Sequence, residues 1–532
     1  MSTIKQGIFT DFTNSHRTHQ KEAIASLETA DIGQVSIPTG TGKTRIQIHA
    51  HVKDMIEKSD KGETGVYLIA AHRLALCRQL LQELVDLVAA IGLPFDILFV
   101  GSDKIDEDAL YEKQMINGIT KATCYVTATT KQAEVLKAVD DAKKANRHVI
   151  LVSTYHSIER LTLLNRIDIA TYDEAHTIAS SRQSDDNFES SIKRLQDKGM
   201  IKRQYFFTAT RKVSGDDYGM NNEDIYGEVL YEASPGKMIR EGEIVQPRIH
   251  RVSTVDDGQF KNETMIIKTI MDVFSHHKKA VRDASSLAGN LGAKLLISAE
   301  GTPEVRKIVN NNNLKAWCLR NKIRLFVFSS ILGNYMFNSE WKFEKASRNS
   351  VVDEMQGMDD AQDAILIHID ILSEGIDLPS ITGVMPFREL NLIKLLQTIG
   401  RGARLLRGDR KNFYKGITKP LDFDKMVKPY CWVIFPLLSD KTSEASKKMK
   451  RTIETVVAAY DAPKMQFNRE DEYIGDPDPD ISPITPRDAS TKVDPTTNLN
   501  HWLEQLMINP EVVDGHTLSK SLGEVADPKL IL

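Results

Sequence analysis

Short apolar runs alternate with longer helical stretches through residues 34–211. The runs predicted to form buried strands are 33–37, 66–70, 95–100, 148–153, 167–172 and 204–208. Between them, apolar residues recur at helical spacing, as in 44–57 and 74–90. This alternation is typical of a parallel sheet covered by helices.

A second stretch of the chain repeats the same pattern. Its predicted strands are 294–298, 324–328, 364–369, 383–387 and 430–435. Its predicted helices are 264–275, 303–313 and 393–398. We therefore predict an α/β protein with two open parallel sheets of similar size.

Two segments depart from this pattern. Residues 214–248 are rich in Gly, Asp, Glu and Pro, which predicts a connection between the two units and not a core element. The Asp-Pro run 476–480 predicts a stiff linker ahead of a small helical tail near 499–507, which could bind a protein partner. The expected units are an N-terminal lobe 1–213, a connection 214–250, a C-terminal lobe 251–460 and a tail 461–532.

Composition narrows the class of protein only a little. With 41% hydrophobic and 27% charged residues among 532, most of the chain should fold. A net charge of -4 neither supports nor excludes nucleic-acid binding, since local basic grooves occur in mildly acidic proteins. No apolar run approaches the roughly 18 residues of a membrane span, so we expect a cytoplasmic protein of a bacterial or phage-infected cell. The four cysteines form no CxxC pair and predict buried thiols, not a zinc site.

Residues 36–44, Ser-Ile-Pro-Thr-Gly-Thr-Gly-Lys-Thr, join an apolar strand to a helix, which is the context of a phosphate-binding loop. The glycines would let backbone N–H groups close around phosphates, Lys43 would lie by the β- and γ-phosphates, and the Thr44 hydroxyl would bind Mg²⁺. Ile37 stands where the strict pattern has glycine, but the loop resembles the version in superfamily 2 helicases. The alternative is an ordinary Gly-rich turn. The residues expected to contact ATP here are Pro38, Thr39, Gly40, Thr41, Gly42, Lys43 and Thr44.

Asp173-Glu174-Ala175-His176 follows the apolar run 167–172, at the strand end where α/β proteins bind ligands. Asp173 would hold Mg²⁺, and Glu174 would orient and deprotonate the attacking water. An isolated acidic pair is often a solvated turn. Its position after a phosphate loop makes the pair a strong candidate.

Two further motifs of the first lobe are predicted only from their resemblance to superfamily 2 helicases. Thr208-Ala209-Thr210 resembles the third motif of superfamily 2, which with His176 would couple hydrolysis to the nucleic-acid groove. Arg17 and Gln20 resemble the adenine-recognition element that precedes the phosphate loop, with Gln20 as the base reader. The alternative for these two residues is a polar helix start.

The second lobe carries the remaining motifs of this resemblance. Gly375 and Asp377 resemble motif V, where such residues approach the sugar and γ-phosphate across the cleft. Residues 397–404 resemble motif VI, with Gln397 at its first position and two arginines, Arg401 and Arg404. An arginine from the facing lobe can offset charge on the transferred phosphoryl group. A basic helix end favoured by the helix dipole is the alternative.

The motif order over roughly residues 15–440 resembles superfamily 2 helicases, which implies two tandem RecA-like lobes with P-loop NTPase chemistry, ATP and Mg²⁺. Residues 224–229 and 239–245 look like the group of restriction-enzyme motor subunits and phage or RecG-like branch-migration helicases. That resemblance implies an ATP-dependent DNA helicase or translocase. An ATP-gated nucleic-acid-binding scaffold or motor subunit and an RNA helicase are the alternatives.

Candidate contacts to the nucleic-acid backbone lie at strand ends on one sheet edge. In the first lobe they are Arg73 and the hydroxyls of Ser153 and Thr154. In the second lobe Ser298 and Ser373 are weaker candidates, because ordinary turn and capping roles compete. The expected partner is single-stranded or branched DNA held by its phosphates, with RNA as the alternative.

Overall fold

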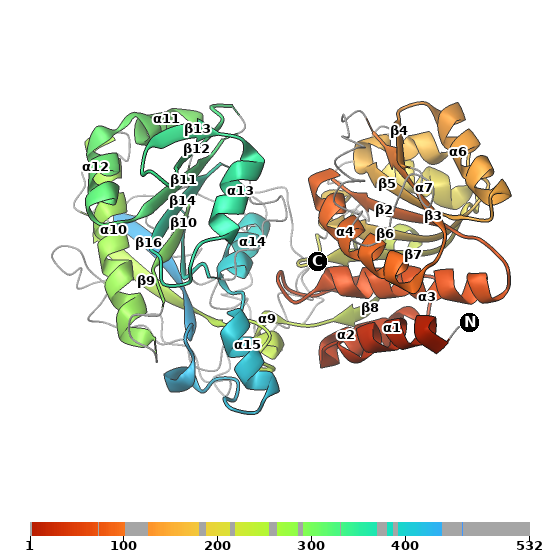
Figure 1. Ribbon diagram of the computed structural model, residues 1–532, viewed down its shortest axis with the longest axis horizontal. Coiled ribbons are helices and arrows are strands. Elements are labelled where there is room, and N and C mark those ends of the chain that lie inside the picture. Colours follow the sequence, from red (N-terminus) through yellow and green to blue (C-terminus); the bar gives the residue numbers. More distant parts are fainter. Residues whose placement is uncertain are drawn as a thin grey trace, which may run out of the picture.

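The structure is a computed structural model that describes residues 3–72, 74–101, 126–179, 188–212, 219–254, 263–285, 291–299, 301–329, 331–369, 380–386, 392–438 and 460. Its two sheets form two lobes that lie side by side (Figure 1). The strand alternation read from the sequence therefore corresponds to two α/β units. The predicted tail 461–532 lies outside the described residues.

The first sheet is entirely parallel in its described pairings, with strand order β4-β3-β5-β2-β6-β7-β1-β8. Each predicted strand of this lobe is present within a few residues of its expected bounds. The strands are β1 (Ile32–Ser36), β2 (Val66–Ala71), β3 (Phe95–Val100), β4 (Val126–Thr129), β5 (His148–Thr154), β6 (Ile167–Asp173), β7 (Ile201–Thr208) and β8 (Glu228–Glu232). The central strands read as continuous apolar runs because both faces are buried.

The second sheet has the order β13-β12-β11-β14-β10-β15-β16-β9, parallel except for the antiparallel β12 and β13 at one edge. All five predicted strands are present. The strands are β9 (Gln246–Thr254), β10 (Lys294–Ser298), β11 (Arg324–Phe328), β12 (Asn334–Phe337), β13 (Phe343–Ala346), β14 (Ala364–His368), β15 (Gly383–Pro386) and β16 (Tyr430–Leu438).

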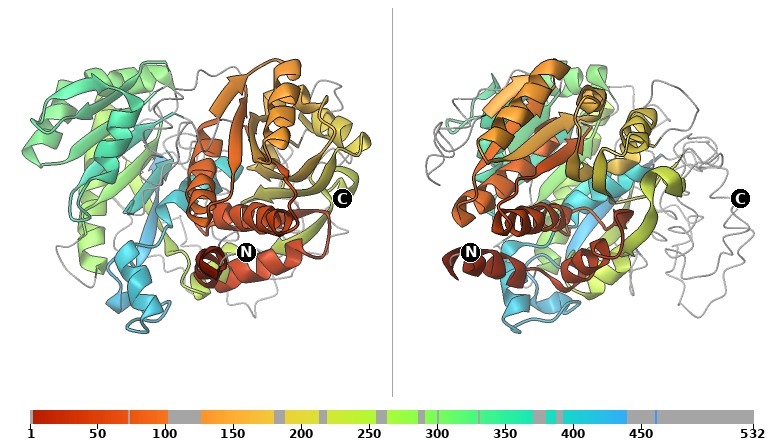
Figure 2. Two further views of the ribbon diagram at one scale, coloured as in Figure 1. Left: turned by 45° about the vertical axis from the view of Figure 1, so that its right-hand side comes forward. Right: turned by 90° about the vertical axis from the view of Figure 1, so that its right-hand side faces the viewer.

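Helices cover the sheets, and α1 and α2 lie along the side of α3 that faces away from the first sheet (Figures 1 and 2). The predicted helix 303–313 is two helices, because the Asn311 side chain caps a new helix by accepting from the Leu314 N–H. The α-helices are α1 (Thr3–Asn14), α2 (Thr18–Leu27), α3 (Lys43–Asp60), α4 (Leu74–Ile91), α6 (Gln132–Lys144), α7 (Phe188–Asp197), α8 (Glu223–Tyr226), α9 (Pro235–Arg240), α10 (Glu263–Ala284), α11 (Thr302–Asn310), α12 (Asn312–Arg320), α13 (Arg348–Gln356), α14 (Leu392–Gly402) and α15 (Arg407–Tyr414). None of the helices so described is long and apolar enough to cross a membrane.

The segment 214–250 is more than a connection, which corrects the prediction that it holds no core element. Strand β8 pairs with β1 at the edge of the first sheet, and β9 pairs with β16 at the edge of the second. Edge strands need only one apolar face, so the polar composition of this segment hid them. The chain thus leaves one sheet and enters the next within a few residues.

One apolar cluster continues from the first lobe into the second. It includes Val35 of β1 in the first sheet, Ile244 in the connection and Val433 of β16 in the second sheet. Residues of the connection and of α14 belong to this cluster, and Figure 1 shows α14 on the side of the second lobe that faces the first, with α9 below it beside α15. The apolar core is thus continuous between the two lobes.

Candidate active site between the lobes

The loop after β1 has the backbone that phosphate binding requires. Gly40 and Gly42 have φ of 85° and 92°, in the left-handed region that side chains disfavour. Thr41 is buried, and its hydroxyl donates to the Pro38 carbonyl at 2.7 Å, which fixes the turn. The loop opens directly into α3, whose N-terminus adds a positive electrostatic potential.

The predicted base-recognition element packs against this loop. The Gln20 amide donates to the carbonyls of Thr41 at 3.3 Å and Gly42 at 3.2 Å, and its oxygen accepts from the Arg17 N–H at 2.9 Å. A Cβ on Gly42 would lie 2.4 Å from Gln20 Nε2 and 2.6 Å from Arg17 NH2. Only glycine therefore allows the loop and this element to approach so closely.

Asp173 and Glu174 end β6 beside the loop. Burial raises the pKa of Asp173 to about 6, with the Glu174 charge acting in the same direction and Lys43 against it. Although burial opposes the shift, Lys43, His176, His72 and Arg401 together lower the pKa of Glu174. Two adjacent carboxylates thus differ in protonation behaviour, as acid–base sites require.

Side-chain hydrogen bonds position Asp173, and an unusual backbone conformation positions Glu174. The Tyr155 hydroxyl donates to the Asp173 carbonyl at 2.5 Å, and the Gln47 amide donates to Asp173 Oδ1 at 3.2 Å. Glu174 has φ of 53°, which is strained for a residue with a Cβ and costs on the order of 1–3 kcal/mol. Such strain is sustained where the surroundings impose one orientation on a side chain.

A directed hydrogen-bond chain leads from the acidic motif to the third motif and across the lobes. The Thr208 hydroxyl donates to the Thr210 carbonyl at 2.8 Å, so it accepts from His176 Nδ1, which lies 3.1 Å away. His176 Nε2 then accepts from the Gln397 amide of the second lobe at 3.4 Å. Burial lowers the pKa of His176 to about 4, so the ring is neutral and the chain keeps this direction near pH 7.

Both arginines of α14 and its following turn reach the first lobe. Arg401 is 8% exposed and lies close enough to Glu174 to lower the pKa of that carboxyl. Arg404 packs on the phosphate loop, since a Cβ on Gly40 would lie 2.9 Å from Arg404 Cγ. A Cβ on Gly400 would likewise lie 2.9 Å from Thr39 Cβ. The loop, the acidic pair and the two arginines thus meet in one place.

These residues fit a magnesium–nucleotide complex. Thr44 and Asp173 supply hard oxygen ligands of the kind Mg²⁺ prefers, and Lys43 Nζ donates to the Ile37 carbonyl at 3.4 Å. In the described part of the chain, no three His, Cys, Asp or Glu residues gather as a metal site. A bound Mg²⁺ would therefore take most of its ligands from phosphate oxygens and water, as it commonly does.

Other candidate residues lie elsewhere. Ser153 and Ser298 are buried, and their hydroxyls are engaged with the Val100 carbonyl at 3.3 Å and His368 Nε2 at 2.9 Å. In this conformation neither hydroxyl is presented to a backbone phosphate, whereas Thr154 is partly exposed. Arg73, Ser373, Gly375 and Asp377 lie outside the described residues. The nucleic-acid contacts stay predictions.

Two residues that the sequence does not single out contact residues of the candidate site. Lys428 is buried, and its Nζ donates to the carbonyls of Gly402 and Arg404, each at 2.7 Å. Glu243 forms an ion pair with Arg17. Lys428 belongs to no predicted motif, and the resemblance of residues 239–245 does not indicate a contact between Glu243 and Arg17. Only the three-dimensional arrangement brings both residues to the site.

Residues 17–216 match the family model described as DEAD/DEAH box helicase. No curated protein matches the chain. Among solved structures, the ATP-dependent Type ISP restriction-modification enzyme LlaBIII bound to DNA has a TM-score of 0.58 at 15% identity, covering 96% of this chain and 33% of that one. This likeness confirms the fold with two RecA-like lobes, and the chain spans about a third of that enzyme's length.

Two further structures are similar at lower scores. A nuclease-deletion mutant of the Type ISP enzyme LlaGI in complex with a DNA substrate mimic has a TM-score of 0.49 at 15% identity, covering 87% of this chain and 29% of that one. The DEAD-box helicase Mss116 bound to ssRNA and UDP-BeF also has 0.49 at 15% identity, covering 96% of this chain and 87% of that one.

Proposed function

We propose that this chain, whose residues 17–216 match the DEAD/DEAH box helicase model, hydrolyses ATP between its lobes and uses that reaction to translocate on, unwind or remodel DNA. The observation that carries the proposal is the meeting of Arg401 and Arg404 with Glu174 and Gly40 across the lobes. Each lobe alone holds only part of the chemical groups. Hydrolysis would therefore require the lobes to be closed.

Each group has a definite task in hydrolysis. Glu174 would orient a water molecule and accept its proton as the water oxygen bonds to the γ-phosphorus and the bond to the ADP oxygen breaks. Lys43 would hold phosphate oxygens, and Arg401 and Arg404 would offset the charge that develops on them. Mg²⁺ held by Thr44 and Asp173 would neutralise further phosphate charge when bound.

Product release would weaken the contacts between the lobes. Once the γ-phosphate leaves, Arg401 and Arg404 lose the charge that they share with Lys43, so an open arrangement becomes competitive. The Gln397–His176–Thr208 chain would carry the change to the strand ends of the first lobe. Cycles of closing and opening could then move the two lobes along a bound strand.

DNA is the substrate we favour over RNA. The LlaBIII enzyme, which shares the two-lobed fold, is described as bound to DNA. Branched DNA and a single-stranded track are both compatible with contacts to backbone phosphates alone. We propose these phosphates as the main points of contact.

Steady-state ATP hydrolysis with single-stranded, duplex, forked DNA and RNA as effectors tests the proposal. We expect turnover to rise with DNA and to vanish in K43A. Stimulation by RNA alone would refute the DNA substrate. An absence of turnover with every effector would refute the hydrolase.

A further inference from the structure

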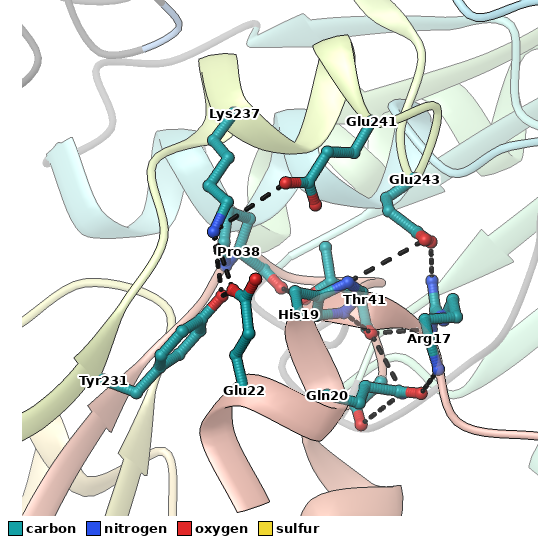
Figure 3. A network of polar contacts seen from close by, with 11 residues as sticks. Arg17, His19, Gln20, Glu22, Pro38, Thr41, Tyr231, Lys237, Glu241 and Glu243 are labelled. Carbon is teal, nitrogen blue, oxygen red and sulfur yellow. Dashed lines mark hydrogen bonds and ion pairs between the residues drawn. The ribbon is translucent and has the colours of Figure 1, made fainter. Parts of the chain in front are cut away.

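Glu243 occupies an unusual place between the two lobes. It directly follows the turn that ends α9, and its side chain is only 11% exposed. Figure 3 shows its carboxylate pointing at Arg17, with which it forms a hydrogen-bonded ion pair, and at His19, whose Nδ1 lies 3.8 Å away. An acidic residue of the inter-lobe connection is thus buried against the N-terminal base-recognition element.

Arg17 passes this contact on to the phosphate loop. Its NH2 donates to the Thr41 carbonyl at 2.6 Å, while its NH1 is held by Glu243. Its backbone N–H donates to Gln20 Oε1, and the Gln20 amide returns to the same Thr41 carbonyl. Arg17 therefore holds the loop through its guanidinium group and the candidate base reader through its backbone N–H.

The residues that follow Glu243 pair with residues 403–404, which we call the arginine segment. Ile244 forms an antiparallel bridge with Arg404, and the Val245 N–H donates to the Ala403 carbonyl at 2.8 Å. Arg404 packs back on Gly40 of the phosphate loop. Base reader, loop, Glu243 and arginine segment thus form a closed ring of contacts that includes both lobes.

We propose that Glu243 is a positioning residue that links recognition of the nucleotide base in the first lobe to placement of Arg404 from the second. A base bound at Gln20 would hold Arg17, Arg17 would hold Glu243, and Glu243 would keep residues 244–245 paired with 403–404. The correct nucleotide would then favour the hydrolytic arrangement. This proposal rests on the proposed ATP hydrolysis.

The neighbouring Glu241 provides a matched comparison. It lies two residues away on the same turn, but its side chain is 31% exposed and its partner Lys237 lies 3.7 Å away on the same helix (Figure 3). An exposed pair of this kind contributes little, whereas breaking a buried pair leaves an uncompensated charge. Loss of charge at the two positions should therefore have very different effects.

The experiment measures kcat and KM for ATP and for UTP in the full chain with DNA, for wild type, E243Q, E241Q, R17Q and the R17Q/E243Q double variant. We expect E243Q to lower kcat/KM for ATP about ten-fold through both constants and to reduce the preference for ATP over UTP. E241Q should remain within about two-fold of wild type, and the double variant should be no worse than the poorer single variant.

Different results would overturn the proposed ATP hydrolysis and the proposed role of Glu243. If wild type hydrolyses no ATP, the proposed function fails. If wild type is active but E243Q behaves like E241Q, or if the effects of R17Q and E243Q simply add, the link through Glu243 fails. Should E243Q be unfolded by its thermal transition, R17Q decides: a reduced preference for ATP over UTP in folded R17Q supports the link, and an unchanged preference overturns it.

Discussion

Gln397 and His176 lie on different lobes, and 3.4 Å separate the Nε2 atoms of the two side chains. The imidazole in turn donates to Thr208, so this single contact joins the second lobe to the strand end behind the acidic motif. A hydrogen bond between lobes exists only while they are closed. It is therefore suited to report closure to the rest of the site.

Replacing Gln397 by Ala should weaken coupling more than binding. One lost hydrogen bond corresponds to about 1 kcal/mol, or roughly a five-fold loss in the stimulation of kcat by DNA. The affinity for ATP should change little, because Gln397 is not placed at the phosphate loop. Stimulation equal to wild type in Q397A, measured at saturating DNA, would contradict this role.

Glu174→Gln should separate binding from hydrolysis. We expect kcat to fall by about 10²–10⁴ because the amide cannot accept the proton of the attacking water. ATP binding, followed by the fluorescence of a labelled nucleotide, should persist since the shape of the side chain is kept. Full cellular function of E174Q would instead indicate an ATP-gated clamp.

Lys428→Met tests the support behind the arginines. The change leaves the buried carbonyls of Gly402 and Arg404 without their donor, which should lower the free energy of unfolding by about 1–3 kcal/mol. The control is K425M, an exposed lysine three residues earlier that pairs with Asp422. The midpoint of urea unfolding should be lower in K428M than in K425M. Equal midpoints would show that Lys428 does not stabilise the segment around Gly402 and Arg404.

Acid should destabilise the first lobe through His51. Burial lowers the pKa of this ring, which contacts the Thr171 hydroxyl at 2.9 Å, to about 3. The unfolded chain takes up a proton near the ordinary pKa while the folded chain does not, so stability is full above that value and is lost as pH falls toward 3. At about pH 5 the loss is roughly 2 kcal/mol.

H51Q removes the titrating group and can keep the hydrogen bond to Thr171. The difference in unfolding free energy between about pH 7 and about pH 5 should therefore shrink in H51Q. An unchanged pH dependence would mean that other groups govern the acid response.

The parts of this molecule that the sequence predicts well are those with local signatures. The phosphate loop requires a left-handed backbone at Gly40 and Gly42. A short run of neighbouring residues therefore suffices to predict it. The buried central strands are likewise legible because both faces are apolar. The edge strands β8 and β9 have only one apolar face each, so the sequence predicts a connection in their place.

Residues that act through distant contacts leave no such trace. Glu243 and Arg17 are far apart in the chain, and nothing in the composition of either segment indicates that they pair. The strand-end position of Ser298 predicts a phosphate contact, but in this conformation its hydroxyl is buried against His368. Whether such a side chain is buried depends on tertiary packing, and the residues next to it in the sequence do not determine that packing.

The most direct test of the account is the rate of DNA-stimulated ATP hydrolysis in R404Q, with R407Q as the control. Arg404 packs on the phosphate loop, whereas Arg407 is exposed at the start of α15. If the second lobe completes the site, kcat in R404Q should fall by about 10³-fold while ATP and DNA still bind, and R407Q should behave as wild type. Turnover in R404Q equal to that in R407Q would contradict a site shared between the lobes.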